Sequence, residues 1–113
     1  MAVKLKRVYD SYESSDGFRI LVDRVWPRGI KKADLHLDLW LKEVAPSTEL
    51  RKWFNHEDEK WKIFLKKYEK ETHTSEAFIN LKKIIKENKT VTLLYSAKNE
   101  EHNQAVAIKS FLK

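Results

Sequence analysis

The sequence predicts a single α/β domain of three layers, with about four mostly parallel strands and helices on both faces of the sheet. Three observations predict this fold class. Short apolar runs alternate with longer segments of helical periodicity, and residues 91–95 are β-branched or apolar throughout, as in a strand covered on both faces. The chain has 113 residues, a length that favours one domain. We therefore expect one domain over residues 1–113.

Four segments have the character of strands. Residues 3–9 carry spaced apolar side chains, and residues 18–22 form a nearly uninterrupted apolar run after a polar, turn-rich connection. From 35 to 41 every odd position is leucine, and this alternation has the period of a strand. The run at 91–95 is the fourth.

Four helices are predicted in the remaining segments. Ser47 follows a proline and is a predicted N-cap, with the apolar side chains of the next residues on one face. Residues 58–71 place aromatic and apolar side chains at i, i+3, i+4 and i+7, which indicates an amphipathic helix. The predicted helices begin at Ser47, at about residue 58, at Thr74 or Ser75, and near Asn99.

Ligands of parallel α/β sheets bind outside the carboxyl ends of the strands, where the loops and helix N-termini converge. The loop after the second predicted strand carries four cations and no acid over residues 24–32. The forked guanidinium groups of Arg24 and Arg28 match phosphate or carboxylate, and Trp26 is suited to stacking on a base. The alternative is a solvated basic turn with Trp26 in the core and Arg24 paired with an acid.

The segment after the third predicted strand ends at a helix N-terminus. Its free N–H groups and the hydroxyl of Ser47 are able to hold an anion, with Lys42 nearby. Taken alone, Ser47 is more readily explained as an N-cap. Arg51, in the first turns of that helix, would reach the mouth of the pocket.

The segment after the fourth predicted strand offers a hydroxyl at Ser96, an ammonium at Lys98 and an amide at Asn103. His102 lies in the same segment, and an imidazole exchanges a proton near neutral pH. His102 and Tyr95 are therefore the candidates for proton transfer. The alternative makes His102 a hydrogen-bonded structural residue.

Several classes of protein are excluded or disfavoured. The chain has no cysteine, and its four histidines lack the short spacing of metal ligands, so we expect no disulfide and no metal. It lacks the glycines of a phosphate-binding loop or a dinucleotide fingerprint, and we expect no cofactor. Since there is no export signal and no apolar run of about 20 residues, we expect a cytoplasmic protein without a membrane segment.

The motifs of the three loops together resemble domain-of-unknown-function family 488, the YeaO-like group of small bacterial and archaeal proteins. The resemblance rests on residues 24–29, 45–56 and 92–105, in that order, and spans nearly the whole chain. It implies an intracellular α/β domain and no settled activity, and nothing in the three segments indicates a degenerate copy. The motif residues correspond here to Arg24, Trp26, Pro27, Arg28, Gly29, Lys42, Pro46, Ser47, Arg51, His56, Tyr95, Lys98, His102 and Asn103.

These observations predict a basic pocket that binds, and if chemistry occurs acts on, an anionic small molecule or nucleotide bearing phosphate or carboxylate. Arg24, Arg28 and Lys98 would hold the anion. The net charge of +6 also admits an alternative, a nucleic-acid-binding accessory protein that uses the same loop and the lysines of residues 82–89. A third interpretation is purely structural: the charged motif residues form a network of ion pairs that holds the loops in place. The ligand, the reaction and the oligomeric state are not fixed by the sequence.

Overall fold

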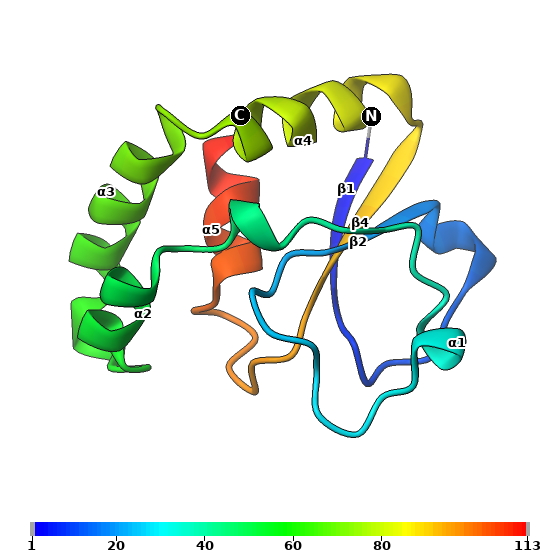
Figure 1. Ribbon diagram of the computed structural model, residues 1–113, viewed down its shortest axis with the longest axis horizontal. Coiled ribbons are helices and arrows are strands. Elements are labelled where there is room, and N and C mark those ends of the chain that lie inside the picture. The colour runs from blue at the N-terminus through cyan, green and yellow to red at the C-terminus, as the bar shows by residue number, and fades with distance from the viewer. Residues whose placement is uncertain (1, 113) are drawn as a thin grey trace.

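A four-stranded parallel sheet forms the centre of the domain in the computed structural model, which describes residues 2–112. The strand order is β1-β4-β2-β3, and every neighbouring pair is parallel. This arrangement confirms the predicted α/β class (Figure 1). The strands are β1 (Ala2–Arg7), β2 (Phe18–Leu21), β3 (Leu39–Trp40) and β4 (Thr90–Tyr95).

Helices fill most of the chain outside the sheet. Four of them have seven residues or more, and one α-helix and three 3-10 turns are shorter. The long helices are α2 (Thr48–Phe54), α3 (Trp61–Thr72), α4 (Glu76–Glu87) and α5 (Gln104–Phe111), and the short elements are α1 (Lys32–Leu35), η1 (Ser14–Asp16), η2 (Lys42–Val44) and η3 (Asp58–Lys60).

Side-chain caps set the beginnings of three long helices. Ser47 and Ser75 each accept a backbone N–H from the residue three positions later. The predicted cap at Ser47 is confirmed, and of the two predicted alternatives, Thr74 and Ser75, the structure has Ser75. The last helix begins at Gln104, with Asn103 as its cap, and not near Asn99. The reason is local: the Asn99 side-chain oxygen accepts two backbone N–H groups of the following residues, a turn that competes with helix.

The strand predicted over 35–41 is wrong for most of its length. Leu35 ends α1, His36 adopts a left-handed conformation (φ 52°), and only Leu39–Trp40 pair with β2. The alternating leucines contact two different cores: Leu35 and the partly buried Leu37 lie in the smaller one, whereas the leucines at 39 and 41 pack against the larger one. The alternation of leucines therefore arises because these side chains are buried in cores on two sides of the sheet, and it does not indicate one continuous strand.

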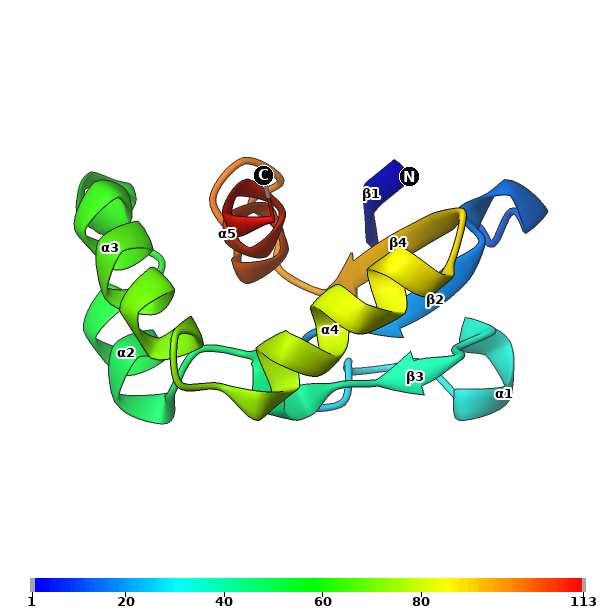
Figure 2. The same ribbon diagram turned by 90° about the horizontal axis from the view of Figure 1, so that it is seen from above.

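The sheet separates a large core from a small one (Figure 2). Ile20 and Leu93 point into the large core, which the buried faces of α2, α3, α4 and α5 complete. Leu21 and Leu94 point the other way, into a small core covered by α1 and the loop after β2. The domain has the three expected layers, but the second outer layer contains only a four-residue helix and irregular chain.

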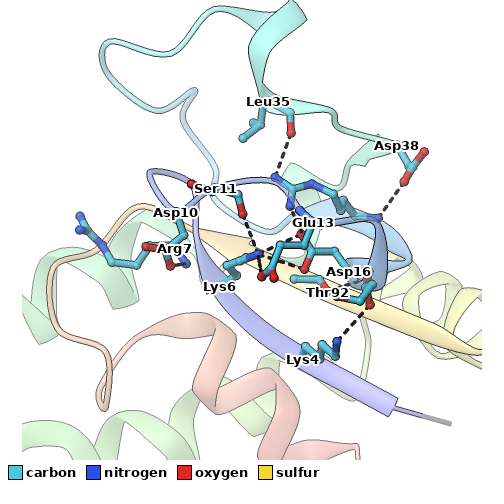
Figure 3. A network of polar contacts seen from close by, with 12 residues as sticks. Lys4, Lys6, Arg7, Asp10, Ser11, Glu13, Asp16, Leu35, Asp38 and Thr92 are labelled. Carbon is cyan, nitrogen blue, oxygen red and sulfur yellow. Dashed lines mark hydrogen bonds and ion pairs between the residues drawn. The ribbon is translucent and has the colours of Figure 1, made fainter.

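A buried arginine joins several elements beneath the small core. Arg19 of β2 is 1% exposed; it forms an ion pair with Asp16 and donates to the Leu35 carbonyl oxygen at 2.9 Å. Asp16 also accepts from the Lys6 ammonium at 3.0 Å, and its carbonyl oxygen accepts from the Thr92 hydroxyl at 2.7 Å. This network links β1, η1, β2, β4 and α1 (Figure 3).

We expect Asp16→Asn to destabilise the fold by about 3 kcal/mol at neutral pH, because it leaves the charge of Arg19 buried without its partner. Burial alone raises the pKa of Asp16, but hydrogen bonds from the Glu13 backbone, Lys6 and Arg19 outweigh it and hold the pKa below 3.8, the usual value.

The stabilisation by ionised Asp16 is therefore complete above that usual pKa and is lost as the pH falls through the lower, folded-state pKa. Urea unfolding from about pH 7 to about pH 2 measures both effects. The wild-type protein should lose more stability below about pH 4 than the variant. Parallel pH curves for the two proteins would contradict this assignment.

We expect Gly17→Ala to destabilise the fold by about 3 kcal/mol. Gly17 has a φ of 68°, and an added Cβ would overlap the Thr90 carbonyl oxygen. Gly29→Ala is the matched control, since Gly29 also has a positive φ (81°) but open space around the added carbon, and it should cost only about 1 kcal/mol. Equal losses in thermal or urea unfolding would show that the close approach to β4 is unimportant.

Candidate functional site

A pocket of about 450 Å³ opens outside the carboxyl ends of the strands. Its walls come from residues 23–25 after β2, from 45, 46 and 48 at the entry of α2, from 51, 52 and 54–56 in α2 and the turn after it, and from 96, 97 and 102–104 after β4, with Phe64 of α3. The loops after β2 and β4 meet at the same end of the sheet because the two strands are parallel neighbours (Figure 1). The pocket therefore lies where the topology of the sheet predicts a ligand.

A buried carboxyl group contributes to the wall of this pocket. Asp23 is 7% exposed, and its Oδ2 atom accepts from the Ser96 backbone N–H at 3.0 Å and from the Ser96 hydroxyl at 2.6 Å. The Gln104 side-chain amide donates to Oδ1. Burial raises the pKa of Asp23, although the Ser96 donors and the charge of Arg51 act in the opposite direction. The carboxyl group thus joins the end of β2 to the β4–α5 loop.

Three cationic side chains line the same pocket. Arg24 donates from its guanidinium to the carbonyl oxygens of Ala45 and Pro46, at 3.1 Å and 3.2 Å, and so connects the β2 loop to the entry of α2. Arg51 and Lys52 of α2 are exposed. Within residues 2–112 neither side chain takes part in a hydrogen bond or an ion pair, although Lys52 and Arg51 both line the pocket. Their charges remain available to a ligand.

His102 forms part of the wall and is held in one orientation. Its Nδ1 atom lies 2.9 Å from the Asp58 carboxylate, and its ring stacks on Trp61 with centroids 4.7 Å apart. The backbone N–H of His102 donates to Asn99 Oδ1. When Nδ1 donates to Asp58, Nε2 of the neutral ring is an acceptor.

The turn after α2 has an uncommon backbone. Asn55 and His56, both on the pocket wall, have φ values of 46° and 55°. Two successive non-glycine residues in the left-handed region are rare, and such conformations persist only where surrounding structure holds them. Here the turn places His56 beside Phe54, with ring centroids 6.4 Å apart.

The structure brings five of the sequence-predicted site residues together. They come from the loop after β2, from α2 and from the β4–α5 segment, which are far apart in the chain. The residues that line the pocket are Arg24, Arg51, Ser96, His102 and Asn103.

Three other predicted residues carry contacts elsewhere. Trp26 donates from its indole N–H to the Ile30 carbonyl oxygen at 2.7 Å and belongs to the small core. Lys42 is exposed, with its ammonium over the Trp40 ring. The Ser47 hydroxyl donates to a side-chain carboxylate of α3 at 2.6 Å while it caps α2.

Three more predicted residues lie outside the lining of the pocket. Arg28 is exposed, and its carbonyl oxygen accepts from the Tyr9 hydroxyl at 3.0 Å. Lys98 is also exposed, and Tyr95 is buried in the large core, where burial raises the pKa of its hydroxyl. Of the three cations predicted to hold an anion, Arg28 and Lys98 thus lie outside the pocket, and Arg24 lines it together with Arg51 and Lys52.

Sequence reasoning missed Asp23, Lys52 and Gln104 as pocket residues. For Asp23 a signal existed, since it is the first acid after the apolar run that forms β2. Gln104 had no such signal, because the beginning of α5 was expected five residues earlier.

Across the part of the chain that the structure describes, no group of three or more His, Cys, Asp or Glu side chains is arranged to hold a metal ion. In the same residues no helix has the length and apolar character needed to cross a bilayer.

Comparison with known proteins identifies the family. A family model described as "Inactive DUF488-N3 subclade" matches residues 2–113. "Uncharacterized protein YeaO" of Escherichia coli (strain K12) is 49% identical over 113 residues, which are 100% of this chain and 98% of that protein. An uncharacterized protein of Mycobacterium tuberculosis (strain H37Rv) is 45% identical over 82 residues, 73% of this chain and 70% of that protein. No solved structure gave a significant match. The chain therefore belongs to the DUF488 family, among its YeaO-like members.

Proposed function

We propose that this domain binds an anionic small molecule or nucleotide, bearing phosphate or carboxylate, in the pocket at the carboxyl ends of the strands. One observation carries the proposal: Arg51 lines that pocket, its charge acts on the carboxyl group of Asp23 in the same wall, and no hydrogen bond or ion pair within residues 2–112 engages its guanidinium group. A planar guanidinium binds phosphate or carboxylate through two parallel hydrogen bonds. Lys52, which lines the same pocket, is a second residue of positive charge there.

The rest of the pocket suits the uncharged part of such a ligand. Phe54 and Phe64 provide apolar surface, and Ser96 and Gln104 provide polar groups. A volume of about 450 Å³ falls within the usual range for small-molecule sites.

The proposed role is binding without a chemical step. The matched family is described as an inactive subclade, which supports this choice. The two residues that the sequence suggested for proton transfer, Tyr95 and His102, have other roles in this proposal. Burial raises the pKa of Tyr95, so its hydroxyl is a poor proton donor at neutral pH. In the proposal His102, held by Asp58 and Trp61, orients the ligand.

The arrangement of the basic segments favours a pocket over a nucleic-acid surface. The lysines of residues 82–89 lie on α4 and just after it, beside the amino end of β4. The basic loop 24–32 follows the carboxyl end of β2. Because the strands are parallel, these two segments lie near opposite ends of the sheet, a placement that disfavours one continuous basic surface.

Arg51→Ala should weaken anion binding about 10-fold to 100-fold, because a charge-assisted hydrogen bond contributes about 1.5–3 kcal/mol. Calorimetric titration with inorganic phosphate and with adenosine monophosphate measures the affinities, and saturable thermal stabilisation gives an independent readout. Lys66→Ala removes the same charge from an exposed site on α3 and is the matched control. It should leave the affinities unchanged.

Two outcomes would overturn the proposal. One is the absence of saturable binding of any phosphate or carboxylate compound to the wild-type protein. The other is binding that Arg51→Ala and Lys66→Ala weaken equally. Tight binding of DNA or RNA that weakens steeply with salt would instead support the nucleic-acid alternative.

A further inference from the structure

The pocket that we propose for an anion also contains a buried carboxyl group. Asp23 is 7% exposed and lines the same cavity as Arg51. An ionised carboxylate repels an anion at short range, and desolvation strengthens that repulsion. A site built only to attract negative charge would not place a carboxyl group there, so Asp23 restricts which anions fit.

The hydrogen bonds of Asp23 leave one acceptor position unused. Oδ2 accepts two hydrogen bonds from Ser96, whereas Oδ1 accepts one, from Gln104. Each carboxylate oxygen has two lone pairs, so Oδ1 retains one. Within residues 2–112 no cation forms an ion pair with Asp23; the charge of Arg51 acts on it from a greater distance. The remaining lone pair of Oδ1 is thus available to a donor on a ligand.

We propose that Asp23 makes the pocket selective for oxyanions that keep a hydroxyl proton, such as hydrogen phosphate, over oxyanions that have none, such as sulfate. This inference rests on the proposed function of the pocket. The P–OH group of hydrogen phosphate donates to Oδ1 of Asp23, and the other phosphate oxygens accept from Arg51 and Lys52. Sulfate has the same shape but no proton in the neutral range, so one of its oxygens would face the carboxylate with no hydrogen bond.

The same rule defines the organic ligand. A phosphate monoester keeps its last proton up to a pKa of about 6, and the proposed contact favours that protonated form. Sulfate esters and sulfonates lack the proton and are excluded. The ligand class is therefore inorganic phosphate or the monoanion of a phosphate monoester, since the monoester dianion that predominates above about pH 6 has no P–OH group.

The test compares inorganic phosphate with sulfate by calorimetric titration at about pH 8, where phosphate still keeps one hydroxyl proton and sulfate has none. The wild-type protein should bind phosphate at least about 100-fold more tightly than sulfate, because a site built to pair with a hydroxyl rejects an analogue without one. In Asp23→Asn the amide N–H donates to sulfate. The variant should bind sulfate at least about 10-fold more tightly than the wild-type protein does, and the preference for phosphate should nearly disappear.

Asp34→Asn is the matched control, since Asp34 is an exposed acid on α1, and it should keep the wild-type preference. A ligand series on the wild-type protein gives a second test that needs no variant. Hydrogen arsenate, which keeps its proton, should bind like phosphate, and molybdate, which has none, should bind like sulfate.

The two proposals fail in different ways. If neither phosphate nor arsenate binds the wild-type protein, the proposed function is wrong and this inference falls with it. If phosphate and sulfate bind the wild-type protein equally, the pocket still binds anions and only the role of Asp23 is wrong. A preference for phosphate that persists unchanged in folded Asp23→Asn also overturns the role of Asp23 alone.

Discussion

The position of β4 between β1 and β2 determines where the other parts of the domain lie. β4 is the last strand in the chain, yet it pairs in parallel with both of the first two. Val91, Leu93 and Leu94 are fully buried, so β4 contributes to both cores. Because its neighbours run in the same direction, the loops that follow β2 and β4 meet at one end of the sheet. Asp23 and Ser96 join there directly, and the pocket forms beside them.

Two sets of charged side chains lie beside the sheet. They differ in how many of their charged groups have a hydrogen-bond or ion-pair partner within the protein. Asp16 has partners in Lys6 and Arg19, and Arg19 lacks a partner within the described residues only at Nε. The second set contains Arg51, whose guanidinium has no partner in the same residues, and Asp23, whose Oδ1 retains an acceptor position. Paired buried charges are part of the fold, whereas unpaired charges beside a cavity suit an external ligand.

The sequence was sufficient for the features that depend on local chemistry and less so for those that depend on tertiary contacts. The buried run at 91–95 and the caps at Ser47 and Ser75 were predicted, because strand burial and capping are encoded in neighbouring residues. The strand predicted from the leucines at 35–41 was wrong for most of its length, because a period of two does not show which core each side chain enters. The location of the pocket was predicted from topology, but which cations line it depends on how each loop folds. The basic loop continues past Arg24 into contacts with Tyr9 and the small core, whereas α2 presents Arg51.

The outer strands of the sheet have a consequence for self-association. β3 pairs through only two residues, so that border offers a very short template for adding a strand from another molecule. β1, at the opposite border, is longer, but it carries Lys4, whose ammonium group donates to the Ser15 carbonyl oxygen and has no carboxylate partner within residues 2–112. A lysine on a border strand opposes the addition of a strand from another chain. The charge of Lys4 thus disfavours edge-to-edge association, independently of any ligand.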